Sequence, residues 1–252
     1  MKNDKYPESI DETSRMIGAE DTDWFTCLDV LEGLSRMTYR SFCIVDYMER
    51  RFLYVSDNTL SMCGRSPEEI ISMGSDFYTE YVPEEDLKMI SLARDAAAQF
   101  LETIPKEEKY NYILSYDFHI KNAVTDIQSL INHKYTPLKI TEDGKVKLAI
   151  CLTSMSPHSS SGIIEIMHKN RLDYWMYDLF NKCWKKKARI VLKKEEKEVI
   201  KLSAQGFSIS DMAEHMNKSF DTIKFYRKSL FRKLEVDSIT EALSQAVCKR
   251  LL

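Results

Sequence analysis

The chain has 252 residues, of which 44% are hydrophobic and 30% charged, and its net charge is -3. With a mean hydropathy of -0.37, this composition is that of a folded protein of one or two domains and excludes a mostly disordered chain. No apolar stretch approaches the ~18 residues of a membrane helix, and the polar start does not resemble a secretory signal. We therefore expect a cytoplasmic protein without a membrane contact, whose six scattered cysteines are reduced thiols. None of the seven glycines has the spacing of a dinucleotide-binding or phosphate-binding loop.

The charge is unevenly distributed along the chain. Residues 182–252 contain 17 Lys and Arg against 9 Asp and Glu, a net charge of +8, which leaves -11 for the residues before them. A basic segment such as residues 182–252 is typical of a domain that binds a polyanion, whereas the acidic residues before it need a different partner. The two parts are therefore expected to have different functions.

The first predicted element is an amphipathic helix. Residues 1–22 are polar and are expected to be flexible. From residue 23 to about residue 38, apolar side chains recur at steps of three and four. The stripe formed by Trp24, Leu28 and Leu31 could either pair two subunits or cover a sheet, and the sequence leaves both alternatives open.

Strands and short helices follow in a recognisable order. A hairpin is predicted within residues 42–55, and helix starts follow at Ser66 and Pro83. The hydrophobic period then changes, and three longer strands are predicted at residues 110–119, 128–138 and 145–155. A further strand is predicted at 163–167. Residues 174–177 pair with residues 183–184 as a hairpin or belong to a helix, an alternative that the sequence does not decide.

This order of elements resembles a PAS domain, which has a five-stranded antiparallel sheet with helices between its second and third strands. The stretches 42–46 (Phe-Cys-Ile-Val-Asp), 64–70 (Gly-Arg-Ser-Pro-Glu-Glu-Ile) and 81–86 (Tyr-Val-Pro-Glu-Glu-Asp) resemble segments of that family. The resemblance covers about residues 38–155 and implies a sensor domain that holds a small ligand or serves for dimerisation. A different α+β sheet domain is the alternative.

Four helices are predicted between residues 192 and 252. The first runs from about residue 194 to residue 204 and ends at Gly206. The other three follow residues that cap helices well, namely Ser208, Ser219 and Thr240. A tight turn at residues 217–218 joins the second helix to a basic third helix, which predicts a helix-turn-helix.

The third of these helices has a face suited to a DNA groove. Its apolar positions are Ile223, Tyr226 and Leu230. If these face the core, helical geometry puts Lys224, Phe225 and Lys228 together on the opposite side. Ammonium groups can donate to guanine O6 and N7, and an apolar edge can contact a thymine methyl group. Arg232 and Lys233 lie further along and would meet phosphates.

The C-terminal segment closely resembles the LuxR-type DNA-binding domain over nearly all of residues 192–245. The resemblance rests on Glu196-x-Glu198-Val199-Ile200-x-Leu202-x-Ala204-Gln205-Gly206-Phe207-Ser208, Thr222-Ile223-Lys224 and Arg232-Lys233-Leu234. It implies base contacts from Lys224, Phe225 and Lys228. The predicted DNA-backbone contacts are Lys218, Ser219, Thr222, Arg227, Arg232 and Lys233.

Three features depart from the usual pattern of that family. Lys193 and Lys194 stand where Thr-Pro is usual, and Glu235 stands where Gly is usual. Tyr226 holds a position often filled by His, and Phe225 is bulkier than usual. The base preference of the family therefore cannot be carried over to this chain.

No catalytic or metal-binding arrangement is predicted. The five histidines form no H-x-x-x-H or H-E-x-x-H pair, and Cys63 lacks the neighbours of a flavin-binding cysteine. The antiparallel strands also exclude a phospho-receiver domain, which alternates parallel strands with helices. We therefore expect no enzyme activity, no metal and no cofactor.

The sequence thus predicts an α+β chain in two main parts. A flexible N-terminus (1–22) precedes a PAS-like sensor domain with its leading helix (23–173), a hairpin or basic linker (174–191) and an all-α four-helix DNA-binding domain (192–252). The expected function is that of a DNA-binding transcription regulator, a homodimer on duplex DNA, with a small ligand or a dimer contact in the PAS-like domain. The alternative is a non-enzymatic interaction module whose basic helical tail docks an acidic partner.

Overall fold

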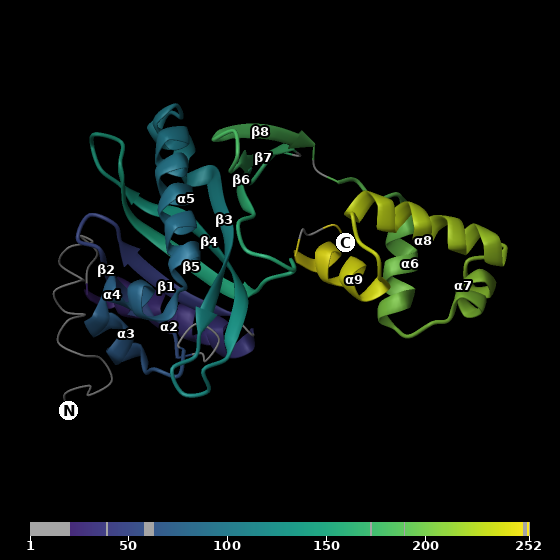
Figure 1. The fold of residues 1–252 in the computed structure, drawn as a ribbon, viewed down its shortest axis with the longest axis horizontal. Helices are drawn as coiled ribbons and strands as arrows, with labels where there is room; N and C mark the ends of the chain where they lie inside the picture. The colour runs from purple at the N-terminus through teal and green to yellow at the C-terminus, as the bar shows by residue number, and fades with distance from the viewer. Residues whose placement is uncertain are drawn as a thin grey trace. The chain divides into compact units, whose positions relative to one another are not determined.

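A computed structural model describes residues 21–38, 40–57, 63–171, 173–188, 190–248 and 251. The chain divides into two compact units, residues 1–187 and 188–252, and each is described by itself (Figure 1). Residues 1–20, part of the N-terminus predicted to be flexible, lie outside the described residues.

The N-terminal unit contains helices and one large sheet. Its elements are α2 (Asp21–Met37), β1 (Ser41–Asp46), β2 (Arg51–Val55), α3 (Pro67–Met73), α4 (Asp76–Tyr81), α5 (Glu84–Glu102), the 3-10 helix η1 (Lys106–Asn111), β3 (Tyr112–Lys121), β4 (Gln128–Ile140), β5 (Val146–Met155), β6 (Ile164–His168), β7 (Asp173–Asp178) and β8 (Cys183–Ala188). In the described part of the chain, the strand order is β2-β1-β5-β4-β3-β6-β7-β8, and neighbours with a resolved register are antiparallel.

The predicted α+β fold class is confirmed by this topology. The first five strands, with α3, α4, α5 and η1 between β2 and β3, reproduce the order that the PAS-like resemblance implies. The sheet then continues beyond β3 through β6, β7 and β8. Residues 174–177, for which the sequence left a hairpin and a helix open, belong to β7, and β8 is its neighbour in the sheet.

Local sequence signals set where the helices begin. At α3, Ser66 Oγ accepts a hydrogen bond from Glu69 N at 3.2 Å, and Glu69 Oε2 accepts one from Ser66 N at 2.8 Å. Pro67 occupies the first turn, where its missing N–H is not needed. This reciprocal cap is the one that the sequence predicts. The helix start at Pro83 is confirmed as well, because α5 begins at the next residue.

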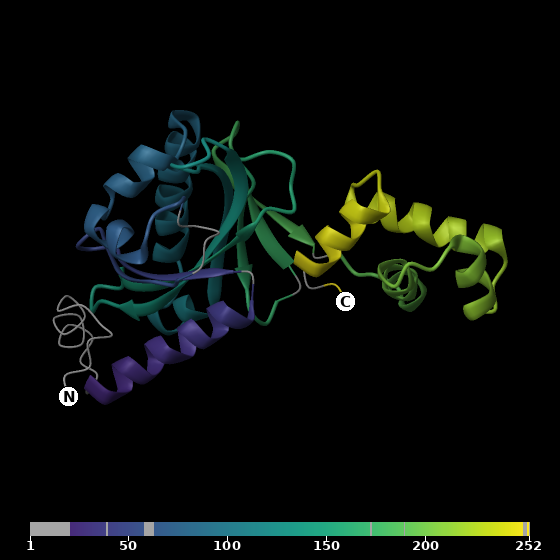
Figure 2. The same ribbon diagram turned by 90° about the horizontal axis from the view of Figure 1, so that it is seen from below.

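The two faces of the sheet are covered by different helices. Helices α3, α4 and α5 pack on one face, where the main core includes Ala93 and Ala97 of α5 and Phe118 of β3. On the other face, Leu28 and Leu31 of α2 pack on residues of the sheet, as Figure 2 shows for the helix as a whole. The sequence left open whether the apolar stripe of α2 pairs two subunits or covers a sheet, and Leu28 and Leu31 cover the sheet. The side chain of Trp24 lies outside the described residues.

The described residues of the C-terminal unit form the four helices that the sequence predicts. They are α6 (Lys194–Ala204), α7 (Ile209–His215), α8 (Phe220–Leu234) and α9 (Ile239–Cys248). Their fully buried side chains include Val199, Ile200, Ile223 and Leu230. The predicted cap at Thr240 is wrong: α9 begins at Ile239, and Ser238 Oγ accepts the hydrogen bond from Glu241 N at 3.1 Å.

Glu235 ends α8 in a conformation that favours glycine. Its φ is 56° and its ψ 47°, the left-handed region, and its N–H donates to Phe231 O. A residue with a Cβ is strained in this region, whereas glycine adopts it freely.

We expect Glu235→Gly to stabilise the C-terminal unit by up to about 1 kcal/mol, measured as a higher urea midpoint of helix unfolding. Asp237→Gly is the control, because Asp237 does not have a positive φ. An unchanged or lower midpoint for Glu235→Gly would contradict the inference that the backbone of Glu235 is strained.

Candidate DNA-binding interface

Helices α7 and α8 form a helix-turn-helix. The turn between them, residues 216–219, is tight because Asn217 adopts a φ of 50° and Lys218 N donates to Ala213 O at 2.9 Å. Ser219 Oγ then accepts a hydrogen bond from Thr222 N at 3.2 Å and so begins α8. The predicted turn and the predicted cap at Ser219 are both confirmed.

Packing fixes which face of α8 is left exposed. Ile223 and Leu230 are 0% exposed in the core of the C-terminal unit. The three side chains predicted to read bases are on the exposed side: Lys224, Phe225 and Lys228. Phe225 is 63% exposed, which is a large apolar area to leave in water. The exposed face of α8 is therefore a basic surface with an apolar member, as the sequence predicts, and we call it the reading face.

A residue that the sequence analysis did not single out contributes to the reading face. Phe220 is the first residue of α8 and is 44% exposed. Lys224 Nζ lies 4.5 Å from the centre of its ring, a cation–π contact that holds the ammonium group over the aromatic face. Phe220 follows the cap residue Ser219 and lies one turn before Lys224. This spacing is the one feature of the sequence that could have assigned Phe220 to the reading face.

The six predicted backbone-contact residues have different surroundings. Lys218 and Arg232 are exposed. The hydroxyl groups of Ser219 and Thr222 lie 2.8 Å apart and belong to the helix cap. Arg227 is partly buried with its guanidinium carbon 5.7 Å from the ring centre of Phe231. Among the basic residues of this set, Lys218 and Arg232 are thus the most open to a phosphate group.

Lys233, the sixth of them, is part of an ion pair. Its Nζ lies 2.7 Å from Glu196 Oε2, and it also donates to Val191 O at 3.1 Å. Glu196 is 1% exposed and further accepts hydrogen bonds from Ser229 Oγ at 2.9 Å and Lys193 N at 2.7 Å. The pair ties the start of α6 to the end of α8. A phosphate contact by Lys233 would have to compete with it.

The environment of Glu196 keeps this carboxylate charged. Burial alone would raise the pKa of Glu196, but the ammonium group of Lys233 and the hydrogen bonds from Lys193 N and Ser229 outweigh it, and the pKa lies below its usual value. The carboxylate therefore keeps its negative charge and its partners at neutral pH.

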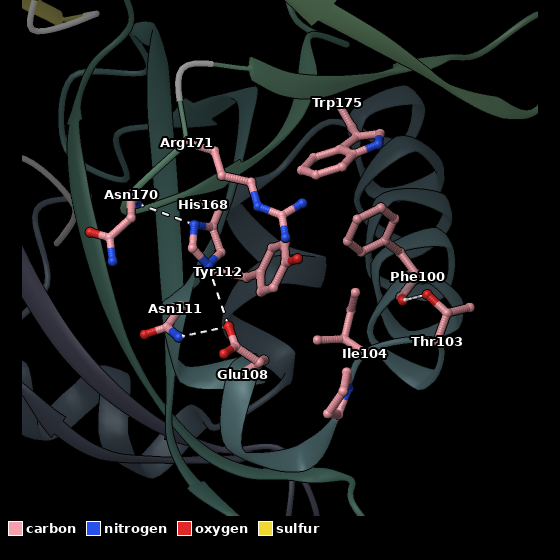
Figure 3. Close-up of a pocket in the computed structure, with 11 residues that line it drawn as sticks. Phe100, Thr103, Ile104, Glu108, Asn111, Tyr112, His168, Asn170, Arg171 and Trp175 are labelled. Atoms are coloured by element: carbon pink, nitrogen blue, oxygen red, sulfur yellow. Dashed lines mark hydrogen bonds and ion pairs between the residues drawn. The ribbon is translucent and has the colours of Figure 1, made fainter.

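The N-terminal unit has a pocket of about 710 Å³ outside its main core, within the size range of small-molecule sites (Figure 3). Three aromatic rings form one wall: Phe100 lies 5.1 Å from Trp175 and 5.7 Å from Tyr112, measured between ring centres. The His168 ring packs on that of Tyr112, with 4.9 Å between ring centres, and His168 Nε2 lies 3.6 Å from Glu108 Oε2. The pocket offers aromatic surface and polar groups to a ligand.

Two other classes of site are not found in the described ranges. No group of three or more His, Cys, Asp or Glu side chains there could hold a metal ion. Among those same residues, no helix combines the length and the apolar character needed to cross a bilayer.

The fold and the reading face of the C-terminal unit are those of a helix-turn-helix DNA-binding domain. Residues 191–246 match the family model described as bacterial regulatory proteins, luxR family. Residues 191–246 therefore form a LuxR-type helix-turn-helix DNA-binding domain, and the matched family is one of regulatory proteins rather than of enzymes. The resemblance stated from the sequence is confirmed.

Solved structures give weaker matches. The response regulator ChrA of a heme-sensing two-component system is 32% identical over 26% of this chain and 33% of its own length, with a TM-score of 0.25. A phage VqmA–DPO complex is 12% identical over 91% of this chain and 88% of its own, with a TM-score of 0.31. A VqmA–ligand–DNA complex from Vibrio cholerae is 16% identical over 83% and 82%, with a TM-score of 0.28. TM-scores below 0.5 establish no shared arrangement of the whole chain. Among curated proteins, none matches the chain.

Proposed function

We propose that the protein binds a specific duplex DNA sequence through the reading face of α8 and thereby regulates transcription in response to a signal received by the N-terminal unit. The observation that carries this proposal is the exposure of Lys224, Phe225 and Lys228 on the second helix of a LuxR-type helix-turn-helix. A helix of this kind lies in the major groove, where each base pair presents a distinct pattern of donors and acceptors.

Each residue of the reading face has a role in this proposal. Lys224 and Lys228 donate hydrogen bonds to guanine edges, and Phe225 contacts a thymine methyl group. Lys218 and Arg232 contact phosphates and position the helix in the groove. Ser219, Thr222 and Arg227 lie near enough in sequence to add backbone contacts, whereas Lys233 contributes mainly by holding α8 through Glu196. Binding releases counterions, so the affinity falls as the salt concentration rises.

The protein is proposed to bind DNA as a homodimer. A single helix-turn-helix reads only a few base pairs, and such domains reach useful specificity by binding two half-sites about one helical turn apart. A two-fold symmetric dimer matches a palindromic operator. A bacterial regulator of this kind meets its DNA in the cytoplasm, and the absence of a candidate membrane helix in the described ranges agrees with this location.

The N-terminal unit is proposed to sense the signal. Its inner core lies between the sheet and helices α3 to α5, and the pocket of about 710 Å³ described above offers aromatic and polar groups to a small ligand. The alternative, in which this unit serves only for dimerisation, predicts that small molecules change neither its stability nor the binding of DNA.

The competing function is that of an interaction module whose basic tail docks an acidic protein. Both functions predict binding that weakens with salt, but only DNA reading predicts a base sequence preference. The test is a binding selection of the full chain against a random duplex library at ~0.15 M salt, where long-range phosphate attraction is largely screened. Recovery of a shared sequence with two related half-sites supports the proposal. Retention without sequence preference, or no retention, would favour the interaction module.

A further inference from the structure

The pocket drawn in Figure 3, here called the outer pocket, is formed by parts of the chain that are far apart in the sequence. Phe100 comes from α5, Glu108 from η1, Tyr112 from β3 and Trp175 from β7, while Arg171 lies between β6 and β7. None of its described lining residues also lines the cavity of about 30 Å³ in the main core. The outer pocket is therefore separate from that cavity.

An aromatic wall gives the outer pocket its apolar surface. The ring of Phe100 meets those of Tyr112 and Trp175 edge to face, with interplanar angles of 67° and 63°. The ring centres of Tyr112 and Trp175 are 6.2 Å apart, so the three rings form one continuous surface. Phe100 and Trp175 remain partly exposed. A flat apolar group that covers this surface displaces water from it, which stabilises the bound state.

Arg171 brings a positive charge to the outer pocket, and its side chain extends toward the aromatic wall in Figure 3. Within the described ranges, no carboxylate oxygen lies within 4.0 Å of its guanidinium group, and no side-chain hydrogen bond holds that group. Arg94 of α5 differs, because it lies 4.9 Å from the ring centre of Tyr78 and hydrogen-bonds with Tyr116. The planar fork of N–H donors on Arg171 is therefore available to a ligand.

Glu108, the acidic residue of the lining, has partners other than Arg171. Its Oε2 accepts a hydrogen bond from Asn111 Nδ2 at 3.0 Å and lies 3.6 Å from His168 Nε2. Hydrogen bonds from Asn111 and His168 lower the pKa of Glu108, and the charge of Arg171 contributes least to the lowering. The carboxylate thus keeps its negative charge and these partners at neutral pH, and it leaves the guanidinium group of Arg171 unpaired.

The surroundings of the aromatic wall favour an anion over a cation as the occupant. Lys186 Nζ already lies 5.9 Å from the ring centre of Trp175. The same ammonium group pairs with Asp173 and lowers its pKa, so this carboxylate does not neutralise Arg171 either. The three rings are in contact and form a wall rather than a cage around an ammonium group. An anion would meet an unpaired guanidinium group, whereas a cation would meet two positive charges.

We propose that the outer pocket binds a small aromatic carboxylate. The two oxygens of the ligand pair with the guanidinium fork of Arg171, and its ring packs on the aromatic wall. A neutral amide of the same shape keeps the ring contact but lacks the charge that pairs with Arg171. This assignment names the ligand class for the sensing role proposed above and rests on that role, but the binding itself does not involve DNA.

Tryptophan fluorescence of the full chain provides the readout. All three tryptophans, Trp24, Trp175 and Trp184, belong to the N-terminal unit, and Trp175 is part of the aromatic wall. The emission is titrated with phenylacetate and phenylpropionate, with their amides, with phenylethylamine and with acetate, at neutral pH and constant ionic strength. At least one aromatic acid is expected to give a saturable change. Its amide should bind about tenfold more weakly or worse, and phenylethylamine and acetate should give no saturable change.

Variants assign the binding to the outer pocket. Arg171→Gln is expected to weaken the aromatic acid by about 10- to 100-fold, because it removes the charged donor. Arg171→Lys should have a smaller effect, since lysine keeps the charge but lacks the planar fork. Glu108→Gln removes a negative charge near the ligand and should tighten the acid roughly two- to fivefold. Lys169→Gln is the matched control: Lys169 is an exposed cation two residues before Arg171 and does not line the pocket, so its loss should change the affinity less than about twofold.

The outcomes separate this site from the proposed regulation. A chain that binds an aromatic acid through Arg171 but selects no DNA sequence keeps the ligand site and loses the proposed function. A chain that selects DNA overturns the ligand site alone if no aromatic acid binds, if acid and amide bind equally, or if Arg171→Gln binds as the wild type does. Tighter binding of phenylethylamine than of the acids, weakened by Glu108→Gln, would overturn it in favour of a cation.

Discussion

Replacing Lys224 with alanine is expected to weaken binding to the selected duplex by about 5- to 150-fold, and Lys228→Ala by a similar factor. The physical reason is that an ammonium group donating to a guanine edge contributes about 1–3 kcal/mol of discrimination. The two residues lie one turn apart on the exposed face of α8, so each would contact a different base. The measurement is the dissociation constant by fluorescence anisotropy at a fixed salt concentration.

The matched control is Lys201→Ala. Lys201 is an exposed lysine of the same unit on α6, away from the reading face, with its Nζ 3.9 Å from Glu198. Its loss removes one positive charge without removing a base contact, so it should change the affinity little and the sequence preference not at all. If Lys224→Ala and Lys228→Ala behaved like Lys201→Ala, the assignment of the reading face would be refuted.

Removing Glu196 is expected to destabilise the C-terminal unit by about 3–5 kcal/mol. Glu196→Ala leaves the ammonium group of Lys233 without its partner and removes the acceptor of Ser229 Oγ and Lys193 N. Breaking a buried pair in this way costs much more than a surface salt bridge. Because Lys233 is still 29% exposed in its side chain, water can replace part of the lost interaction, and the value should fall at the lower end of the range.

Two spectroscopic signals isolate this effect. Far-UV circular dichroism of the helices reports on the C-terminal unit in part, whereas tryptophan fluorescence reports on the N-terminal unit alone. Glu196→Ala should lower the midpoint of the helix signal and leave the fluorescence midpoint in place. Glu198→Ala is the control on the same helix, since the nearest cation to its carboxylate is 3.9 Å away. Equal effects of the two substitutions would show that the buried network does not stabilise the unit.

The lowered pKa of Glu196 adds a pH dependence to this prediction. A carboxyl group with a lowered pKa in the folded state contributes stability that is present above its unfolded pKa, near 4.3, and is lost as the pH falls through the folded value. The helix signal of the wild-type chain should therefore lose stability below about pH 4. Glu196→Gln removes this part of the acid sensitivity, because glutamine does not titrate.

The features that the sequence predicted well are local ones. A cap such as Ser219 acts on an N–H three residues away, and the alternation of apolar and polar residues on α8 is set by helical geometry. The turn, the helices and the exposed face could therefore be derived from neighbouring residues. The cap at Thr240 failed because Ser238, two residues earlier, competes for the same role, and helix boundaries are often uncertain by this amount.

The features that could not be predicted from the sequence depend on residues that are far apart along the chain. Lys233 appears as one more basic residue until Glu196, 37 positions earlier, is packed beside it. Arg94 lies in an ordinary amphipathic helix, and only the folded unit brings Tyr78 and Tyr116 close to it. The stripe of Leu28 and Leu31 could have packed against a second subunit or against the sheet, and its burial against the sheet decides between the two. Such contacts arise from tertiary packing, which no local pattern encodes.

The central claim is that the exposed face of α8 reads bases, and a paired selection tests it most directly. The wild-type chain and Lys224→Ala are each incubated with the same random duplex library at ~0.15 M salt, and the bound sequences are compared. The account predicts a shared motif for the wild type and the loss of preference at one or two of its positions in the variant. An identical motif from both proteins would contradict the account, because the residue at the centre of the reading face would then contribute nothing to specificity.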